Sequence, residues 1–120
     1  MTNPKETTMK TMFRQGDVLI TAATETPKDL KRVDRDQGRV ILAYGEVTGH
    51  AHAILDPDVE LFTIADLDEM AGRFLRVEAE AGALLEHEEH DTITLPPGDY
   101  VVRRQREYTS ADMDPIYVAD

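Results

Sequence analysis

The hydrophobic positions of this chain fall into short runs, and the runs are separated by glycine, proline and aspartate, which favour turns. Apolar runs of about four to eight residues between such turn signals are typical of β-strands. We therefore predict strands at 12–22, 39–44, 50–55, 59–64, 73–79, 83–87, 91–95 and 99–108. Seven or eight short antiparallel strands predict an all-β fold, either a small barrel or a double-sheet roll, because closing or stacking the sheets hides their edges.

Turn residues between the runs support this division. Gly45 and Gly49 flank a tight connection between two predicted strands, and the Asp-Pro-Asp sequence at 56–58 is a turn signal. Prolines lack an amide donor, so the Pro-Pro-Gly sequence at 96–98 cannot continue a central strand. The predicted strands are therefore short and joined mainly by tight turns.

The remaining segments are polar or irregular. The stretch 23–38 is charged and is predicted to form a long loop with a short edge strand around Val33, and 64–72 has the composition of one helical turn. Residues 1–10 show no periodicity and are predicted to form a disordered tail. A length of 120 residues fits one domain, which we place at 11–120.

The charge of the chain narrows the classes of partner. A net charge of −11 repels phosphate backbones and anionic lipids and attracts divalent cations, so it disfavours binding to nucleic acid or membranes. Cysteine is absent, which excludes disulfides, thiolate zinc sites and cysteine nucleophiles. No apolar run approaches the roughly 18 residues of a membrane span, and the polar start lacks a signal-peptide core. We expect a cytoplasmic protein whose partner is a small-molecule substrate or another protein, and an oligomer is compatible with the sequence.

All four histidines lie in two windows, GHAHAILD at 49–56 and EHEEHD at 86–91. Alternate side chains of a strand share a face, so His50 and His52 should point the same way as Ile54, toward the core. His87 and His90 are three residues apart and would share a face only if a bulge or a tight bend occurs at 88–89. All four histidines of the chain belong to these two pairs, and this concentration predicts a metal site.

Neutral imidazole binds zinc, iron and nickel, and carboxylates can complete the coordination shell. Zinc is the first candidate cofactor, with iron, manganese or nickel as alternative divalent transition metals. The predicted metal ligands are His50, His52, His87, His90 and Asp56, and the predicted general bases are Glu46, Glu88 and Glu89. The competing interpretation is that the first pair packs structurally and the acidic second window is a solvated loop. A third reading is a pH-sensing binder without metal.

The run His50-Ala51-His52 followed by Asp56, together with the later PxG turn at 96–98, resembles the cupin pattern. The resemblance implies a small β-barrel with a metal held by two histidines, an acidic residue and a further histidine. Asp56 stands where cupins have glutamate, and Val101 stands where they have the last histidine, so His87 or His90 would have to supply that ligand. The wider pattern over 13–108 resembles small uncharacterised bacterial and phage proteins, which implies no activity.

Two classes of function follow from these residues. The first is a metal-dependent enzyme, either a hydrolase or an oxygenase, in which an open coordination position holds water or a small substrate. The alternative is a non-enzymatic bacterial or phage interaction module in which a metal, if bound, only reinforces a small core. Three protein ligands plus water would favour the enzyme, and four protein ligands would favour the module.

Overall fold

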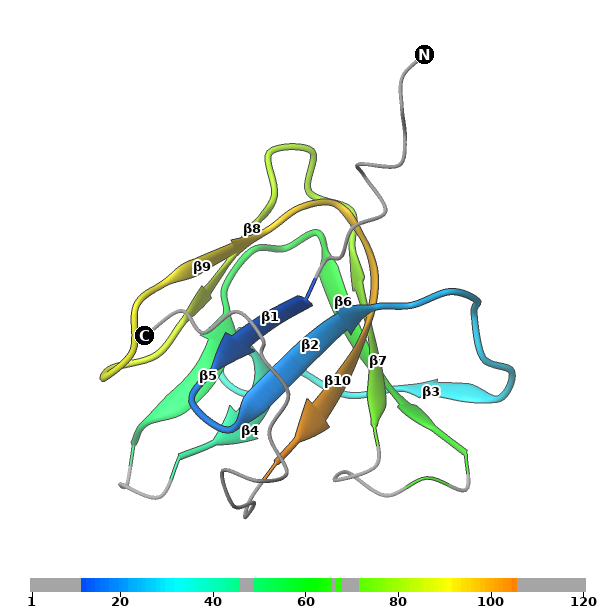
Figure 1. Cartoon of the computed structure of the whole chain (residues 1–120), viewed down its shortest axis with the longest axis horizontal. Helices are drawn as coiled ribbons and strands as arrows, with labels where there is room; N and C mark the ends of the chain where they lie inside the picture. Colours follow the sequence, from blue (N-terminus) through cyan, green and yellow to red (C-terminus); the bar gives the residue numbers. More distant parts are fainter. Residues whose placement is uncertain (1–11, 46–48, 66, 68–71, 106–120) are drawn as a thin grey trace.

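The computed structural model describes residues 12–45, 49–65, 67 and 72–105, and these residues form strands joined by turns and loops (Figure 1). No helix that could cross a membrane occurs in this part of the chain. In chain order the strands are β1 (Met12–Gln15), β2 (Val18–Ala22), β3 (Leu30–Arg32), β4 (Val40–Tyr44), β5 (Ala51–Ile54), β6 (Val59–Ile64), β7 (Arg73–Val77), β8 (Ala83–Glu86), β9 (Ile93–Leu95) and β10 (Gly98–Arg104).

The strands form two antiparallel sheets. One has six strands in the order β1-β2-β10-β7-β6-β3, and the other has four in the order β4-β5-β8-β9. The all-β prediction is therefore confirmed in its double-sheet form, and the described strands do not close into a single barrel. Each sheet turns one face toward the other. The edge strands are β1 and β3 in the first sheet and β4 and β9 in the second.

The core lies between the sheets and takes alternate residues from most strands. Val18 and Ile20 of β2 are fully buried, as are Leu61 of β6 and Leu85 of β8. Burying a side chain of this kind contributes roughly 1.5–3 kcal/mol, so these positions hold the two sheets together. Alternate residues of a strand point to opposite faces, and the inward ones supply this core.

The sequence prediction of one strand at 12–22 is wrong. The chain reverses at Gly16 and Asp17, and Gln15 pairs with Val18, so the run forms the hairpin β1–β2. A two-residue hairpin turn needs a positive φ at its first residue, which Gly16 supplies with a φ of 59°. The polar residues in the middle of the apolar run mark this turn.

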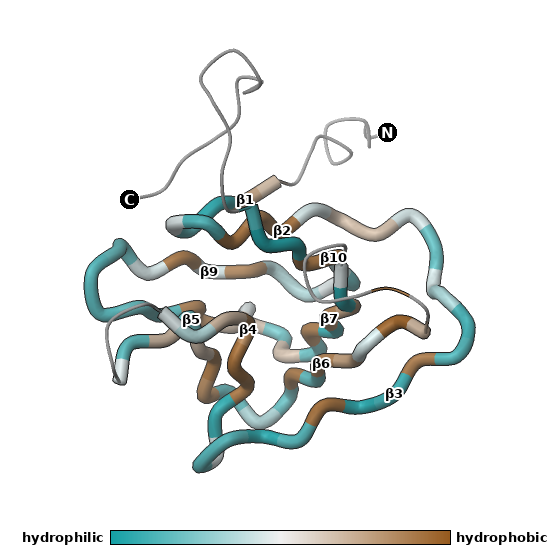
Figure 2. The backbone as a smooth tube through the Cα atoms, turned by 90° about the horizontal axis from the view of Figure 1, so that it is seen from below, coloured by the Kyte–Doolittle hydropathy of each residue, from teal (hydrophilic) through white to brown (hydrophobic). Residues whose placement is uncertain are grey.

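Other predictions differ from the structure by a few residues. The predicted edge strand near Val33 is β3, and the amide of Val33 donates to the carbonyl of Leu61. The connection 23–38 is largely hydrophilic, as predicted (Figure 2). The tail at 1–10 lies outside the described residues, as do most of the predicted helical turn at 64–72 and the end of the last predicted strand.

Candidate functional site

The four imidazoles converge at one end of the fold. The ring centroids of His52 and His87 are 4.2 Å apart, those of His87 and His90 4.7 Å, and those of His50 and His87 5.9 Å. His52 and His90 are stacked with centroids 6.0 Å apart. The start of β5 and the loop after β8 meet here beside the β1–β2 turn (Figure 1). We call these four side chains the histidine cluster.

Strand β5 directs its side chains alternately to the two faces of the four-stranded sheet. His52 is opposite Ala43 of β4, only 3% exposed, and shares its inward face with Ile54. This inward direction was predicted from strand parity. His50 lies just before β5, where its carbonyl accepts the amide of Gly45, and its side chain is 24% exposed. The first pair therefore contributes one buried ring and one ring at the rim.

The second pair is carried by a bend that follows β8. Residues 88–90 form this bend, which confirms the prediction of a tight bend at 88–89. The Glu88 carboxylate accepts the Ala51 amide at 3.0 Å and so ties the bend to the start of β5. Nδ1 of His87 accepts the Glu89 amide at 3.0 Å. The first hydrogen bond joins the bend that carries His87 and His90 to β5, and the second lies within the bend.

The β1–β2 turn closes the cluster from the other sheet. A Cβ atom placed on Gly16 would lie 2.7 Å from His90 Nε2 and 3.3 Å from His52 Cε1. Only the hydrogen of glycine fits in that space, so Gly16 serves both the positive φ of the turn and the close approach of two imidazoles.

Two residues beside Gly16 contact His52 and were not predicted as site residues. Gln15 is fully buried, and its Oε1 lies 2.8 Å from His52 Nδ1. Asp17 Oδ1 lies 3.7 Å from His52 Nε2, while its Oδ2 accepts Arg104 Nε at 3.0 Å. Arg104 is therefore ion-paired with a carboxylate of the fold.

Two rings of the cluster, His52 and His87, are held away from their charged form. Burial is the largest influence on His52 and lowers its pKa to about 4, with a further lowering from His87. Asp17 acts in the opposite direction and Arg104 in the same direction as burial. The pKa of His87 is also lowered, first by burial and then by His90. A neutral ring keeps one nitrogen lone pair for a ligand.

His50 presents a polar atom without a hydrogen bond. Its Nδ1 is buried, and no atom within the described residues makes a hydrogen bond with it. The Glu89 carboxylate lies 3.3 Å away, close enough for an ion pair if His50 is protonated but not in hydrogen-bonding geometry. A buried nitrogen of this kind costs roughly 1–3 kcal/mol unless something binds it.

The structure does not bring Asp56 to the histidine cluster. Its Oδ1 accepts the Asp58 amide at 3.0 Å in the turn that follows the far end of β5, roughly 13 Å along an extended strand from His52. Glu46, another predicted site residue, lies outside the described residues. Of the predicted carboxylates, Glu88 and Glu89 are the two that the structure places at the cluster.

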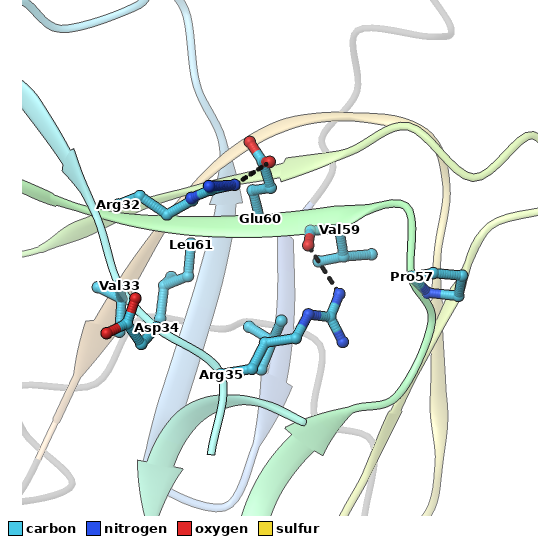
Figure 3. A pocket seen from close by; sticks show the side chains of 9 residues that line it. Arg32, Val33, Asp34, Arg35, Pro57, Val59, Glu60 and Leu61 are labelled. Atoms are coloured by element: carbon cyan, nitrogen blue, oxygen red, sulfur yellow. Dashed lines mark hydrogen bonds and ion pairs between the residues drawn. The ribbon is translucent and has the colours of Figure 1, made fainter. Parts of the chain in front are cut away.

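A hollow of about 360 Å³ lies on the Asp56 side of the molecule (Figure 3). Arg35 crosses it and donates to the carbonyls of Gly38, Asp56 and Val59, while Arg32 pairs with Glu60. The two arginine side chains of this hollow therefore already bind other groups of the protein. A second hollow of about 250 Å³ opens beside the histidine cluster and is lined by Arg39, Ala51, Ala53, Leu55, Glu86, His87 and Glu88.

The rings as they stand are not a complete coordination shell. Among the described residues, no three His, Asp or Glu side chains are placed to hold one metal ion together. His87 is one cause, because its Nδ1 accepts the Glu89 amide and the proton of the neutral ring is then on Nε2. Zinc bonds of 2.0–2.1 Å place two ligand atoms about 3.3 Å apart. The partly exposed rings of His50 and His87 must therefore rotate to bring their nitrogen atoms to this separation from the other ligands.

Comparison with known proteins gives one match. Residues 14–105 match a family model described as a domain of unknown function, DUF8820. Neither the curated proteins nor the solved structures contain a match.

Proposed function

The chain belongs to the DUF8820 family, and we propose that its histidine cluster binds one divalent transition metal ion per chain. Zinc is the first candidate, and iron, manganese or nickel are the alternatives. The observation that carries the proposal is the meeting of both histidine pairs, with His52 and His87 ring centroids 4.2 Å apart.

Charge and burial favour a cation at this place. Imidazoles this close would repel one another if protonated, and burial keeps His52 neutral with a pKa of about 4. The chain has a net charge of −11, which attracts divalent cations. The Glu89 carboxylate beside His50 adds negative charge that favours a cation here. A bound cation would also satisfy the buried Nδ1 of His50.

The number of protein ligands decides what the metal does. Three protein ligands leave a position for water or a small substrate. Glu88 already accepts the Ala51 amide, which is the main reason its pKa is lowered, and its carboxylate is occupied by this contact. Glu89 is the general base in this hydrolytic version, and a shell of four imidazoles would instead be structural.

Calorimetric titration of the untagged protein with zinc tests the proposal. We expect one saturable site per chain and an affinity about tenfold or more lower in His52→Ala. The matched control is Glu60→Gln, which changes an exposed carboxylate paired with Arg32 and should bind zinc as the wild type does. Binding that excess magnesium abolishes, or that His52→Ala leaves unchanged, would assign the metal to surface carboxylates and contradict the proposal.

A further inference from the structure

We propose that Gln15 fixes the tautomer of His52 with the proton on Nδ1 and the lone pair on Nε2. His52 Nε2 and Asp17 Oδ1 then face each other and can bind one electron-pair acceptor together. The assignment of that acceptor as a metal cation rests on the proposed function, whereas the tautomer does not. The proposal adds Asp17 as a ligand and Gln15 as a positioning residue.

The orientation of the Gln15 amide is set from two sides. Its Nε2 donates to the carbonyl of Leu85 at 3.0 Å and to the carbonyl of Asp91 at 2.9 Å. Carbonyl oxygens only accept hydrogen bonds, so the NH₂ group must occupy this side of the amide. Gln15 is fully buried, and reversing the amide would set its oxygen against two carbonyl oxygens.

The fixed amide dictates where His52 carries its proton. Oε1 of Gln15 lies 2.8 Å from His52 Nδ1, and an amide oxygen only accepts. Nδ1 must therefore donate, which places the single proton of the neutral ring there and leaves the lone pair on Nε2. Metal-binding histidines are commonly oriented in this way by a hydrogen bond to the other ring nitrogen.

The lone pair on His52 Nε2 faces a carboxylate. Asp17 Oδ1 is 3.7 Å away, beyond hydrogen-bond length, and Nε2 has no proton to offer it. Two ligand atoms of one tetrahedral zinc ion lie about 3.3 Å apart, so a small approach of these two atoms would let both bind one metal. The other carboxylate oxygen, Oδ2, accepts Arg104 Nε at 3.0 Å, so Oδ1 is the oxygen that faces His52.

The tautomer is tested on metal-free, ¹⁵N-labelled protein at about pH 7 by long-range ¹H–¹⁵N correlation. We expect His52 Nδ1 to resonate as a protonated nitrogen and Nε2 as an unprotonated one. Gln15→Met removes the acceptor at similar length and should shift His52 toward the Nε2–H form, while Gln105→Met should leave it unchanged. An Nε2–H ring in the wild type would overturn the proposal, and that spectrum decides even if Gln15→Met does not fold.

The ligand pair is tested by zinc titration of two variants that both break the Asp17–Arg104 ion pair. Asp17→Asn should bind zinc about tenfold or more weakly, whereas Arg104→Gln keeps the carboxylate and should retain binding. Asp34→Asn is the control for a lost surface charge. Equal losses in the two variants, or wild-type affinity in Asp17→Asn, would overturn the pair. Absence of zinc binding in the wild type would instead defeat the proposed function and leave the tautomer result standing.

Discussion

Replacing Gly16 by alanine should lower the free energy of unfolding by about 2–4 kcal/mol and weaken zinc binding about tenfold or more. A side chain at its φ of 59° costs roughly 1–2 kcal/mol. The added Cβ would also lie 2.7 Å from His90 Nε2, a separation that forces the imidazole to move. Displacing that ring disturbs His52 as well, because its Cε1 lies 3.3 Å from the same position.

Gly38→Ala separates the backbone cost from the contact with the histidines. Gly38 has a φ of 82°, and a Cβ there meets no atom within 4 Å. This control should lose about 1–2 kcal/mol in urea unfolding and bind zinc as the wild type does. Equal effects of the two substitutions on stability and on zinc affinity would show that Gly16 matters for its backbone alone.

Acidification should destabilise the metal-free protein by about 2 kcal/mol between about pH 7 and pH 5. The pKa of His52 falls from 6.5 to about 4 on folding, so in this window the unfolded ring takes up a proton that the folded ring does not. The unfolded state therefore gains protons first, and stability is lost as the pH falls below about 6.5. The lowered pKa of His87 acts in the same direction.

Urea unfolding at a series of pH values measures this effect. The charged and titratable groups that face His52 are Asp17, Arg104 and the neighbouring imidazoles of His87 and His90. His52→Gln removes the titrating ring, so its stability should change less over the same range. A wild-type stability that is flat, or that rises as the pH falls, would show that His52 is protonated in the folded state.

The sequence predicted most strands because the apolar runs are short and are separated by strong turn residues. The β1–β2 hairpin was not predicted, because the apolar residues of 12–22 suggest one continuous strand. Gln15, Gly16 and Asp17 interrupt that strand. Polar residues with a glycine at the centre of an apolar run are the signal that would have located the turn. Whether the sheets close or stack depends on strand pairing across the whole chain, which local patterns do not specify.

The candidate site was predicted in part. Strand parity placed His52 with Ile54 on the inward face, and the spacing of His87 and His90 required the bend that the structure contains. The sequence did not reveal Gln15 as a partner of His52, because they meet only through packing of the two sheets. The cupin-like expectation of Asp56 as a ligand came from the resemblance to the cupin motif, whereas the carboxylate lies in a turn beyond the far end of β5.

X-ray absorption at the zinc edge of the zinc-loaded, untagged protein tests the central claim most directly, because it counts the ligands of the metal itself. A metal held by the histidine cluster should show two or more imidazole nitrogens at about 2.0–2.1 Å, with the multiple scattering of imidazole rings, and that scattering should weaken in His52→Ala and in His90→Ala alike. A shell of oxygen atoms without imidazole scattering, or a spectrum that neither substitution changes, would contradict metal binding by the cluster.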